Sequence, residues 1–502
     1  MRYFIRFILC FAALSFIGCA SINTNVTKDN FFLTATLYDY ILHDHLPGNN
    51  EPDMALLNLF FAKMPKGGDI HHHYSGTIYA ETYLDWVGKK GWLIDPCSLT
   101  IINPLKSHKN TLCDKKPLSV KELMSDTLLY RKLLTLWSDK DFNNHSHEQV
   151  PPDLNFFNTF DYFHMISDEY TDIGLQIIKK RAVNENVAYI ESMLSRVGVK
   201  GRDYISDIQR QKFNRKLRKA KTQAQVNKIL DKLSYEFTKN PKFEASLNSF
   251  LSKVANDHKN IDDNNFLMRY QTYCVRVFGP VQVFADLFSG YMAAIKSPLI
   301  VGVNIVAPEN NKTALADYTL HMRMFNYLKT KYPGVNRALH AGELTLGMVR
   351  PKDLLFHINQ ARKIADAQRI GHGVDISYET NPIALLEDLK NHSVIEINLT
   401  SNSFILGVEK NRHPYLIYSK YNVPMVICTD DSGVSRNNLT NEYLILATRY
   451  KPSYGQIKQY VYNSIKYSFL SEQDKIMVSK RIEKSFLSFE KDMAALYDRL
   501  SF

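Results

Sequence analysis

Short apolar runs, rich in β-branched residues, recur along the chain, and each ends in polar residues or glycine. Most of these runs are nearly continuous in apolar residues, which is typical of strands buried on both faces of a parallel sheet. The pattern therefore predicts eight strands. In chain order they are Gly67–His71, Val187–Met193, Tyr273–Phe278, Leu299–Val306, Val335–His340, Arg369–His372, Val394–Leu399 and Pro424–Thr429.

The segments between the later runs have the spacing of helices, as in Leu315–Thr330, Pro351–Ala367 and Asn381–Lys390. Strands that alternate with helices eight times indicate an α/β protein with a (β/α)8 barrel of the TIM type. A helix-prone segment, Phe31–Phe61, precedes the first strand. We expect residues 19–62 to form a helical N-terminal segment and residues 63–502 to form the barrel.

Two gaps between strands are too long for simple connections, and we interpret them as inserts after strands one and two. The first insert covers about residues 86–150, and the second covers about residues 197–265. The second contains a basic stretch, Arg210 to Leu233, which would suit a polyanion or form a solvated helix face. We favour the solvated face, because basic runs of this kind usually lie on exposed helices.

The start of the chain is typical of a secretory signal. Arg2 and Arg6 flank the apolar run Phe7 to Ile17, which is too short to span a bilayer comfortably. Gly18-Cys19 follows as in a bacterial lipobox, so we expect residues 1–18 to be removed and Cys19 to be lipidated. The alternative is an ordinary signal peptide cut near Ala20. Both readings predict export, either to the bacterial periplasm or cell envelope as a lipoprotein anchored in the membrane, or by secretion.

The composition of the chain is that of a large globular protein. Its 502 residues are 45% hydrophobic, which excludes general disorder. The net charge of +11 is moderate, and we expect no nucleic-acid partner. Cys274 and Cys428 lie in apolar runs and are expected to be buried thiols. Cys97 and Cys113 lie in a polar stretch, and an oxidising compartment would favour a disulfide between them.

Three pairs of histidines have the spacing H-x-H, and their contexts differ. His71 and His73 end the first predicted strand, where alternate residues point to the same side. Both rings can therefore face the mouth of the barrel. The other pairs lie in a helix-like segment and in a polar loop, so we expect them on the surface. They are His43/His45 and His145/His147.

Other predicted strands also end in residues that carry chemistry. Strand five ends near His340 and Glu343, strand six ends at His372, and strand eight is followed by Asp430 and Asp431. The carboxyl ends of barrel strands meet at the face where such barrels place their active sites. Neutral imidazoles and a carboxylate are good ligands for Zn²⁺. Glu343 and His372 then remain as candidates for general acid and base.

At these positions the sequence resembles the adenosine deaminase family. The matching motifs are M-P-K-G-x-x-x-H-x-H at 64–73, H-A-G-E at 340–343, G-H-G at 371–373 and T-D-D at 429–431. The resemblance runs from about Leu57 to Tyr443. The Met-Pro-Lys-Gly opening, the secretory signal and the long first insert look most like the secreted, growth-factor-related branch of that family.

The resemblance implies roles for individual residues. It implies one Zn²⁺ per chain, with Glu343 protonating the purine N1 and His372 orienting and deprotonating the attacking water. It places Asp431, Ala307 and Glu309 at the substrate, although Ala307 stands where the family has a glycine. Tyr74-Ser75-Gly76 replaces an acidic residue that the family often has near the ribose. The implied zinc ligands are His71, His73, His340 and Asp430.

We therefore expect hydrolytic deamination of adenosine, and of 2′-deoxyadenosine, to inosine-type products and ammonia. One alternative is a deaminase of another adenine-containing compound. A second is a non-catalytic, surface-tethered binding protein, against which the intact Glu343 argues. A dihydroorotase-like enzyme would need a lysine on the fourth strand, and Leu299–Val306 has none. The oligomeric state is left open, a dimer included.

Overall fold

The computed structural model describes residues 24–43, 51–105, 114–140 and 150–500. The signal region with Cys19, and also His45, Cys113, His145 and His147, lie outside the described residues. Within the described part of the chain, none of the helices combines the length and the apolar character needed to cross a bilayer.

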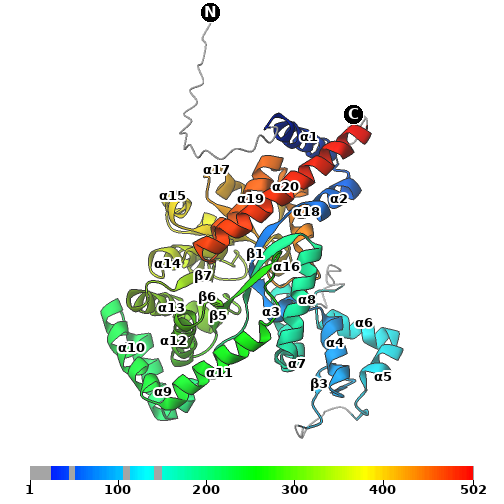
Figure 1. The fold of residues 1–502 in the computed structure, drawn as a ribbon. Helices are drawn as coiled ribbons and strands as arrows, with labels where there is room; N and C mark the ends of the chain where they lie inside the picture. The colour runs from blue at the N-terminus through cyan, green and yellow to red at the C-terminus, as the bar shows by residue number, and fades with distance from the viewer. Residues whose placement is uncertain (1–23, 44–50, 106–113, 141–149, 501–502) are drawn as a thin grey trace, which may run out of the picture.

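Eight parallel strands form the centre of the molecule, as predicted (Figure 1). A single bridge between His72 and Asp430 brings the end of the last strand beside the first, so the sheet curls into a nearly closed barrel. The carboxyl ends of the first and last strands are therefore neighbours, although about 360 residues separate them in sequence. The strands follow one another in the sheet as β1 (Gly67–His73), β4 (Val187–Met193), β5 (Leu267–Val275), β6 (Ile300–Val306), β7 (Asn336–Ala341), β8 (Arg369–His372), β9 (Val394–Ile397) and β10 (Met425–Ile427).

The third predicted strand has different bounds in the structure. We expected Tyr273–Phe278, whereas β5 begins at Leu267 and ends at Val275. The prediction began too late because Arg269 and Gln271 interrupt the apolar pattern, yet Gln271 is buried inside the barrel and hydrogen-bonded there. It ended too late because Phe278 already lies in the turn that leads to the next helix.

Helices cover the outside of the barrel. The expected helix Pro351–Ala367 is divided into a 3₁₀ turn, η3 (Pro351–Leu354), and α14 (His357–Lys363). The carboxylate of Glu379 explains why α14 begins at His357, since it accepts hydrogen bonds from the backbone N–H groups of Ile358 and Asn359 in the first turn of that helix. The other covering helices are α8 (Thr171–Asn184), α12 (Pro280–Lys296), α13 (Lys312–Lys331), α15 (Pro382–His392), α16 (Leu399–Leu406), α17 (Tyr415–Lys420), α18 (Leu439–Tyr450) and α19 (Tyr454–Lys466).

The N-terminal helices pack against the end of the chain. In Figure 1, α1 (Thr24–His43) lies along the long C-terminal helix α20 (Glu472–Leu500), and α2 (Met54–Lys63) follows it. The Thr34 hydroxyl donates a hydrogen bond to the backbone oxygen of Glu490, and the rings of Phe60 and Phe489 meet edge to face. The helical N-terminal segment is thus part of the packed structure.

The two inserts differ in structure. The predicted first insert, about residues 86–150, contains the hairpin β2 (Leu93–Ile94) and β3 (Ile101–Ile102), α5 (Val120–Ser125) and α6 (Thr127–Leu136), and it is flanked by α3 (Tyr74–Thr77), α4 (Ala80–Lys89) and α7 (Pro152–Ser167). Cys97 in this insert is disulfide-bonded, and the predicted partner Cys113 lies outside the described residues, so the pairing stays a prediction.

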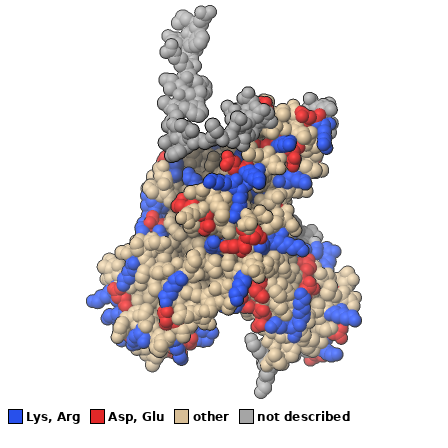
Figure 2. Space-filling view, viewed as in Figure 1, with Lys and Arg blue, Asp and Glu red and all other residues tan. Residues whose placement is uncertain are grey.

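The second insert consists of three helices, α9 (Asp207–Lys219), α10 (Gln223–Thr238) and α11 (Pro241–Asp257). The predicted basic stretch lies on the first two of them. Its cations are partly neutralised, since Arg218 pairs with Asp317 and Arg210 pairs with Asp207. Figure 2 shows basic and acidic side chains interspersed over this side of the molecule, which fits solvated helix faces.

Candidate active site

Four side chains converge at the carboxyl ends of the strands. His71 and His73 end β1, His340 lies on β7, and Asp430 follows β10. Asp430 Oδ1 lies 3.3 Å from His71 Nε2 and 3.2 Å from His73 Nε2, and the Nε2 atoms of His73 and His340 are 3.2 Å apart. The ligand atoms of a tetrahedral zinc site with 2.0–2.1 Å bonds would be about 3.4 Å apart. The spacing of the four side chains therefore suits a small metal ion.

The unpaired atoms of the cluster support the same conclusion. His71 Nε2 and Asp430 Oδ1 are buried and have no hydrogen-bond partner among the described residues. Buried polar atoms of this kind normally bind something, because leaving them unsatisfied costs free energy. Three imidazole nitrogens and one carboxylate oxygen that point at one another form a donor set that fits a divalent metal.

The histidine between the two candidate ligands points elsewhere. The ring of His72 is turned away from the cluster, and its Nδ1 lies 3.0 Å from the hydroxyl of Ser192 on β4. Successive side chains of a strand point to opposite faces, which explains why His71 and His73 point into the cluster and His72 points away from it. His43, from another H-x-H pair, is partly exposed on α1, where its Nδ1 contacts the backbone oxygen of Asp39.

Two of the candidate ligands have an acceptor behind the ring. His71 Nδ1 lies 2.6 Å from Glu396 Oε2, and His340 Nδ1 lies 2.9 Å from Asn304 Oδ1. Asn304 Oδ1 also accepts the N–H of Ile305, which confirms that this atom is the oxygen. A proton on each Nδ1 satisfies these acceptors and leaves the lone pair on Nε2, the atom that a metal ligand must offer.

The acceptors belong to a buried polar network inside the barrel, which the sequence analysis missed. Arg369 pairs with Glu396 at 2.6 Å and also with Glu191, which accepts a hydrogen bond from Gln271 at 2.8 Å. Gln271 in turn accepts from Asn304 at 3.0 Å. The network therefore links the backs of two ligands from opposite sides of the barrel. Charged residues within apolar strands were the available signal, because such groups are rarely buried without partners.

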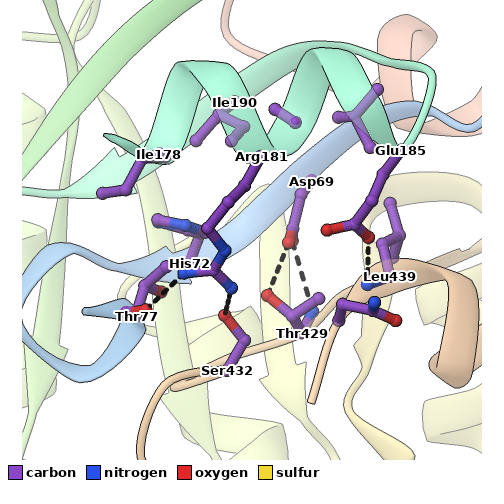
Figure 3. A pocket seen from close by; sticks show the side chains of 13 residues that line it. Asp69, His72, Thr77, Ile178, Arg181, Glu185, Ile190, Thr429, Ser432 and Leu439 are labelled. Carbon is purple, nitrogen blue, oxygen red and sulfur yellow. Dashed lines mark hydrogen bonds between the residues drawn. The ribbon is translucent and has the colours of Figure 1, made fainter. Parts of the chain in front are cut away.

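A second polar cluster holds the first and last strands together (Figure 3). Arg181 on α8 donates to the backbone oxygen of Thr77 at 2.7 Å and to the hydroxyl of Ser432 at 3.3 Å. Asp69 on β1 accepts hydrogen bonds from the backbone N–H and the hydroxyl of Thr429. The cavity between these side chains is ≈ 30 Å³, about the room of one water. The cluster thus ties the strand that carries His71 to the segment that carries Asp430.

The backbone at the site is strained in three places. His372, Asp430 and Ala307 have φ values of +67°, +60° and +83°, in the left-handed region that side chains other than glycine rarely adopt. Such strain collects at functional sites, where the surrounding structure holds it in place. The value at Ala307 gives a physical reason why glycine is the easier residue at this position.

Two glycines are required by close approach. A Cβ atom on Gly76 would lie 1.5 Å from Asp431 Oδ1, and one on Gly371 would lie 2.6 Å from His71 Cε1. Gly76 ends the Tyr74-Ser75-Gly76 segment that stands in place of the acidic residue, and it leaves room for the Asp431 carboxylate. Tyr74 itself points away, with its hydroxyl 3.2 Å from the backbone oxygen of Ser167.

Glu343 lies beside the metal cluster and is only 8% exposed. Burial raises the pKa of its carboxyl group well above the ordinary value, and the negative charges of Asp430 and Glu309 raise it further. The surroundings of Glu343 therefore favour the protonated form of its carboxyl group. A protonated carboxyl group in a buried site can act as a general acid.

Glu309, which we expected at the substrate, is hydrogen-bonded to other groups of the protein. Its carboxylate accepts the backbone N–H groups of Gly342 at 3.2 Å and Glu343 at 2.9 Å, and it lies 2.6 Å from His357 Nδ1. Burial acts to raise the pKa of Glu309, but Arg276 and His357 outweigh it and hold that pKa at about 2. With its side chain fully buried and its oxygens engaged by these donors, Glu309 positions the loop that carries Glu343.

His372 and Asp431 complete the site. His372 Nε2 lies 3.6 Å from Glu343 Oε1 and 3.9 Å from Asp430 Oδ2, and burial lowers the pKa of the ring to about 3. Burial also raises the pKa of Asp431, and the neighbouring Asp430 adds to that rise. Asp431 Oδ1 has no hydrogen-bond partner among the described residues and is available for a ligand. The structure thus brings together every predicted catalytic and metal-binding residue at one mouth of the barrel.

Comparisons with known proteins agree with this site. Residues 265–485 match the family model described as adenosine deaminase. The adenosine deaminase of Enterococcus faecalis is 31% identical over 156 residues, 30% of this chain and 41% of that protein. The N6-methyl-AMP deaminase of Bos taurus is 30% identical over 157 residues, 31% of this chain and 42% of that protein. The chain thus spans about two fifths of the length of these curated relatives.

Solved structures resemble the whole fold. The N6-methyl-AMP deaminase of Arabidopsis thaliana has a TM-score of 0.54 and 15% identity, covering 85% of this chain and 98% of that one. A cog1816 amidohydrolase from Burkholderia ambifaria with bound Zn has a TM-score of 0.52 and 15% identity, covering 87% and 94%. At this identity the likeness shows the barrel fold alone.

The sequence match and the geometry complement each other. The matched region contains His340, Glu343, His372 and Asp430, and the fold adds His71 and His73 from a strand that precedes it. The chain is therefore similar to adenosine deaminases over residues 265–485, and it shares its barrel fold with the solved deaminase structure.

Proposed function

We propose that this protein is a zinc-dependent deaminase of adenine nucleosides, which converts adenosine and 2′-deoxyadenosine to inosine-type products and ammonia. The observation that carries the proposal is the position of a buried Glu343, whose pKa is raised, beside a four-donor metal cluster in one site. The donor set of three imidazoles and a carboxylate favours Zn²⁺, one ion per chain. When bound, such an ion supplies Lewis acidity that makes a water nucleophilic near neutral pH.

The residues of the chain would divide the remaining work. Glu343 would donate its proton to the ring nitrogen N1, which makes C6 more electrophilic. Asp431, with one free carboxyl oxygen, would hydrogen-bond the purine. Water would add its oxygen at C6, the C6–N6 bond would break, and the two water protons would end on N1 and on ammonia. His372 faces the reacting atoms through Nε2.

A second candidate substrate class is an adenine nucleotide. N6-methyl-AMP deaminases match this chain about as well as adenosine deaminases do, at 30% against 31% identity. An Arabidopsis neighbour was solved in complexes with GMP and with IMP. This alternative keeps the same chemistry at C6 and changes only what the site accepts at the 5′ position.

The experiment is a substrate panel with the zinc-loaded protein. We would follow the loss of adenine absorbance with adenosine, 2′-deoxyadenosine, adenine, methylthioadenosine, AMP and N6-methyl-AMP. We expect the highest kcat/KM for the nucleosides, and Glu343→Gln serves as the blank for contaminating activity. A preference for the nucleotides would move the assignment to the second class. A folded, zinc-loaded protein that is inert toward the whole panel would contradict both and favour a binding role.

We further propose that the protein is exported and lipidated at Cys19. The proposal is supported by the basic, apolar and small-residue order of the first 20 residues. Metabolic labelling with a fatty-acid analogue tests it, with Cys19→Ala as the control. Mature protein that begins near residue 21 and carries no label would instead indicate a conventional signal peptide.

A further inference from the structure

We propose that Asn402, held in place by His413, is a positioning residue that keeps the single ring proton of His372 on Nε2. His372 then meets the attacking oxygen as a hydrogen-bond donor, and not as the base that the family resemblance implies. The inference deepens the proposed function and rests on it for the catalytic role of His372. The position of the proton itself follows from hydrogen bonds alone.

The argument begins at a backbone N–H group, because its direction is certain. Tyr415 N lies 3.1 Å from His413 Nδ1, and a backbone N–H can only donate. Nδ1 of His413 must therefore offer its lone pair, and the proton of this buried ring, 3% exposed, is on Nε2. Nε2 lies 3.1 Å from Asn402 Oδ1, to which it donates.

The amide of Asn402 is thereby oriented. Since its oxygen accepts from His413, its NH₂ group faces the other way, 2.9 Å from His372 Nδ1. A flipped amide would place two donors against each other at His413, and each would lose its hydrogen bond. The side-chain amide of Asn398 also contacts this Nδ1, at 3.3 Å.

The ring of His372 has one state that fits these neighbours. Nδ1 accepts from the oriented Asn402 amide and cannot carry a proton, so the proton is on Nε2. Nε2 points toward the reacting side, 3.6 Å from Glu343 Oε1, and it has no hydrogen-bond partner among the described residues. A nitrogen that already bears a proton cannot remove one from water. It can orient the attacking oxygen and stabilise negative charge on it.

The test reverses the hydrogen bond behind the ring. Asn402→Asp keeps the shape but replaces the donating NH₂ with an accepting oxygen, which draws the His372 proton to Nδ1. We expect kcat to fall on the order of 10³–10⁴-fold, the size of loss seen when a catalytic histidine is held in the wrong tautomer. KM and metal content should change little. The matched control is Asn463→Asp, a comparably buried amide that donates to the Met425 backbone oxygen and should leave kcat unchanged.

Two substitutions at His413 separate positioning from packing. His413→Gln retains a donor near the position of Nε2, and we expect kcat within about tenfold of the wild type. His413→Leu cannot donate, so Asn402 is free to rotate, and we expect a loss on the order of 10–10²-fold. Equal losses in both variants would mean that His413 only fills space. They would overturn the proposal that His413 orients Asn402.

A direct readout does not depend on activity. In protein labelled with ¹⁵N in the histidine rings, with His372→Gln for assignment, we expect a protonated Nε2 and an unprotonated Nδ1 at His372. Protonated Nδ1 in the wild type overturns the proposal, and so does an Asn402→Asp variant with normal kcat. If the wild type has no activity on any adenine compound, the proposed function fails, but the NMR signals still decide the tautomer.

Discussion

Two kinds of histidine face the same pocket with the same atom, Nε2, and the groups behind their rings differ. Behind His71 and His340 stand acceptors, the oxygens of Glu396 and Asn304. Behind His372 stand donors, chiefly the NH₂ group of Asn402. An acceptor at Nδ1 leaves a lone pair on Nε2 for a metal, whereas a donor at Nδ1 leaves a proton there for the substrate side.

The difference shows how one side-chain type serves two purposes within a few ångströms. The His71 and His372 rings are both buried and lie 5.0 Å apart between centroids, so burial does not separate their roles. The hydrogen-bond partner of Nδ1 distinguishes the two roles. Each partner comes from another strand or from the segment that follows a strand, which is why the barrel has to close before the roles are assigned.

The largest effect should come from removing any one of the four candidate metal ligands. We expect His71→Ala, His73→Ala, His340→Ala and Asp430→Ala to lose the metal and with it all measurable turnover, since each change removes one of the four donors. Metal analysis of the purified variants measures this. His72→Ala is the matched control on the same strand, because its ring faces Ser192. Metal loss in the control would mean that alternation along β1 does not select the ligands.

Glu343→Gln should have the second-largest effect. It tests the proposed proton donor, which is not one of the metal ligands. Glutamine keeps the size and polarity of the side chain but has no acidic proton to give, so we expect kcat to fall on the order of 10²–10⁴-fold. Metal content should stay normal, since Glu343 is not one of the four donors. Glu490→Gln, a buried glutamate on α20, is the control. Turnover near that of the wild type would exclude Glu343 as the acid.

The pH dependence of the rate sharpens the same assignment. The pKa of Glu343 is raised by burial and by Asp430 and Glu309, so its proton is present below that raised pKa and is lost as the pH rises through it. We therefore expect kcat to hold through the pH range in which an ordinary glutamate ionises, and to fall about tenfold per pH unit only above the raised pKa. A rate that instead rises from neutral to alkaline pH would show that the ionised carboxylate is the active form.

A smaller and more selective effect should follow from changing the acceptors behind the ligands. Glu396→Gln weakens the acceptor at His71 Nδ1, and we expect about 10–100-fold weaker metal binding, measured by competition with a chelator. Asn304→Asp retains an acceptor at His340 Nδ1, so metal binding should change less than in Glu396→Gln. If Asn304→Asp is the more damaging of the two, the acceptor rule fails. The same change at Asn402 should reverse a tautomer, which makes the two asparagines a matched pair.

The smallest effect on catalysis should come from the first insert. We predict that Cys97 is paired with Cys113 and that the bridge, which closes a loop of roughly 15 residues, stabilises the protein by about 3 kcal/mol in the chain-entropy model. Replacing both cysteines by serine should lower the melting temperature and leave kcat unchanged. Peptide mapping without reduction checks the pairing. Two free, alkylatable thiols in the native protein would refute it.

Much of the fold and of the candidate site could be predicted from the order of the residues. Apolar runs at regular intervals predicted eight barrel strands, and the polar residues at their ends predicted the metal cluster and Glu343. The third strand was misplaced because the polar residues Arg269 and Gln271 broke its apolar pattern. Glu309 was assigned to the substrate because its neighbours resembled a purine-binding segment, although its carboxylate holds the Glu343 loop.

The sequence by itself determined local features. These are the periodicity of the strands, the alternation that separates His72 from its neighbours, and the ionisable or metal-binding residues at the strand ends. These depend on residues a few positions apart, so a linear pattern contains them. Only the tertiary structure decided which group stands behind each ring and which carboxyl groups are buried together. The partners of His71 and His372 come from β9 and the segment after it, and the contact between β1 and Asp430 spans most of the chain. Tautomers and pKa values follow from such neighbours, and closure of the barrel is what creates them.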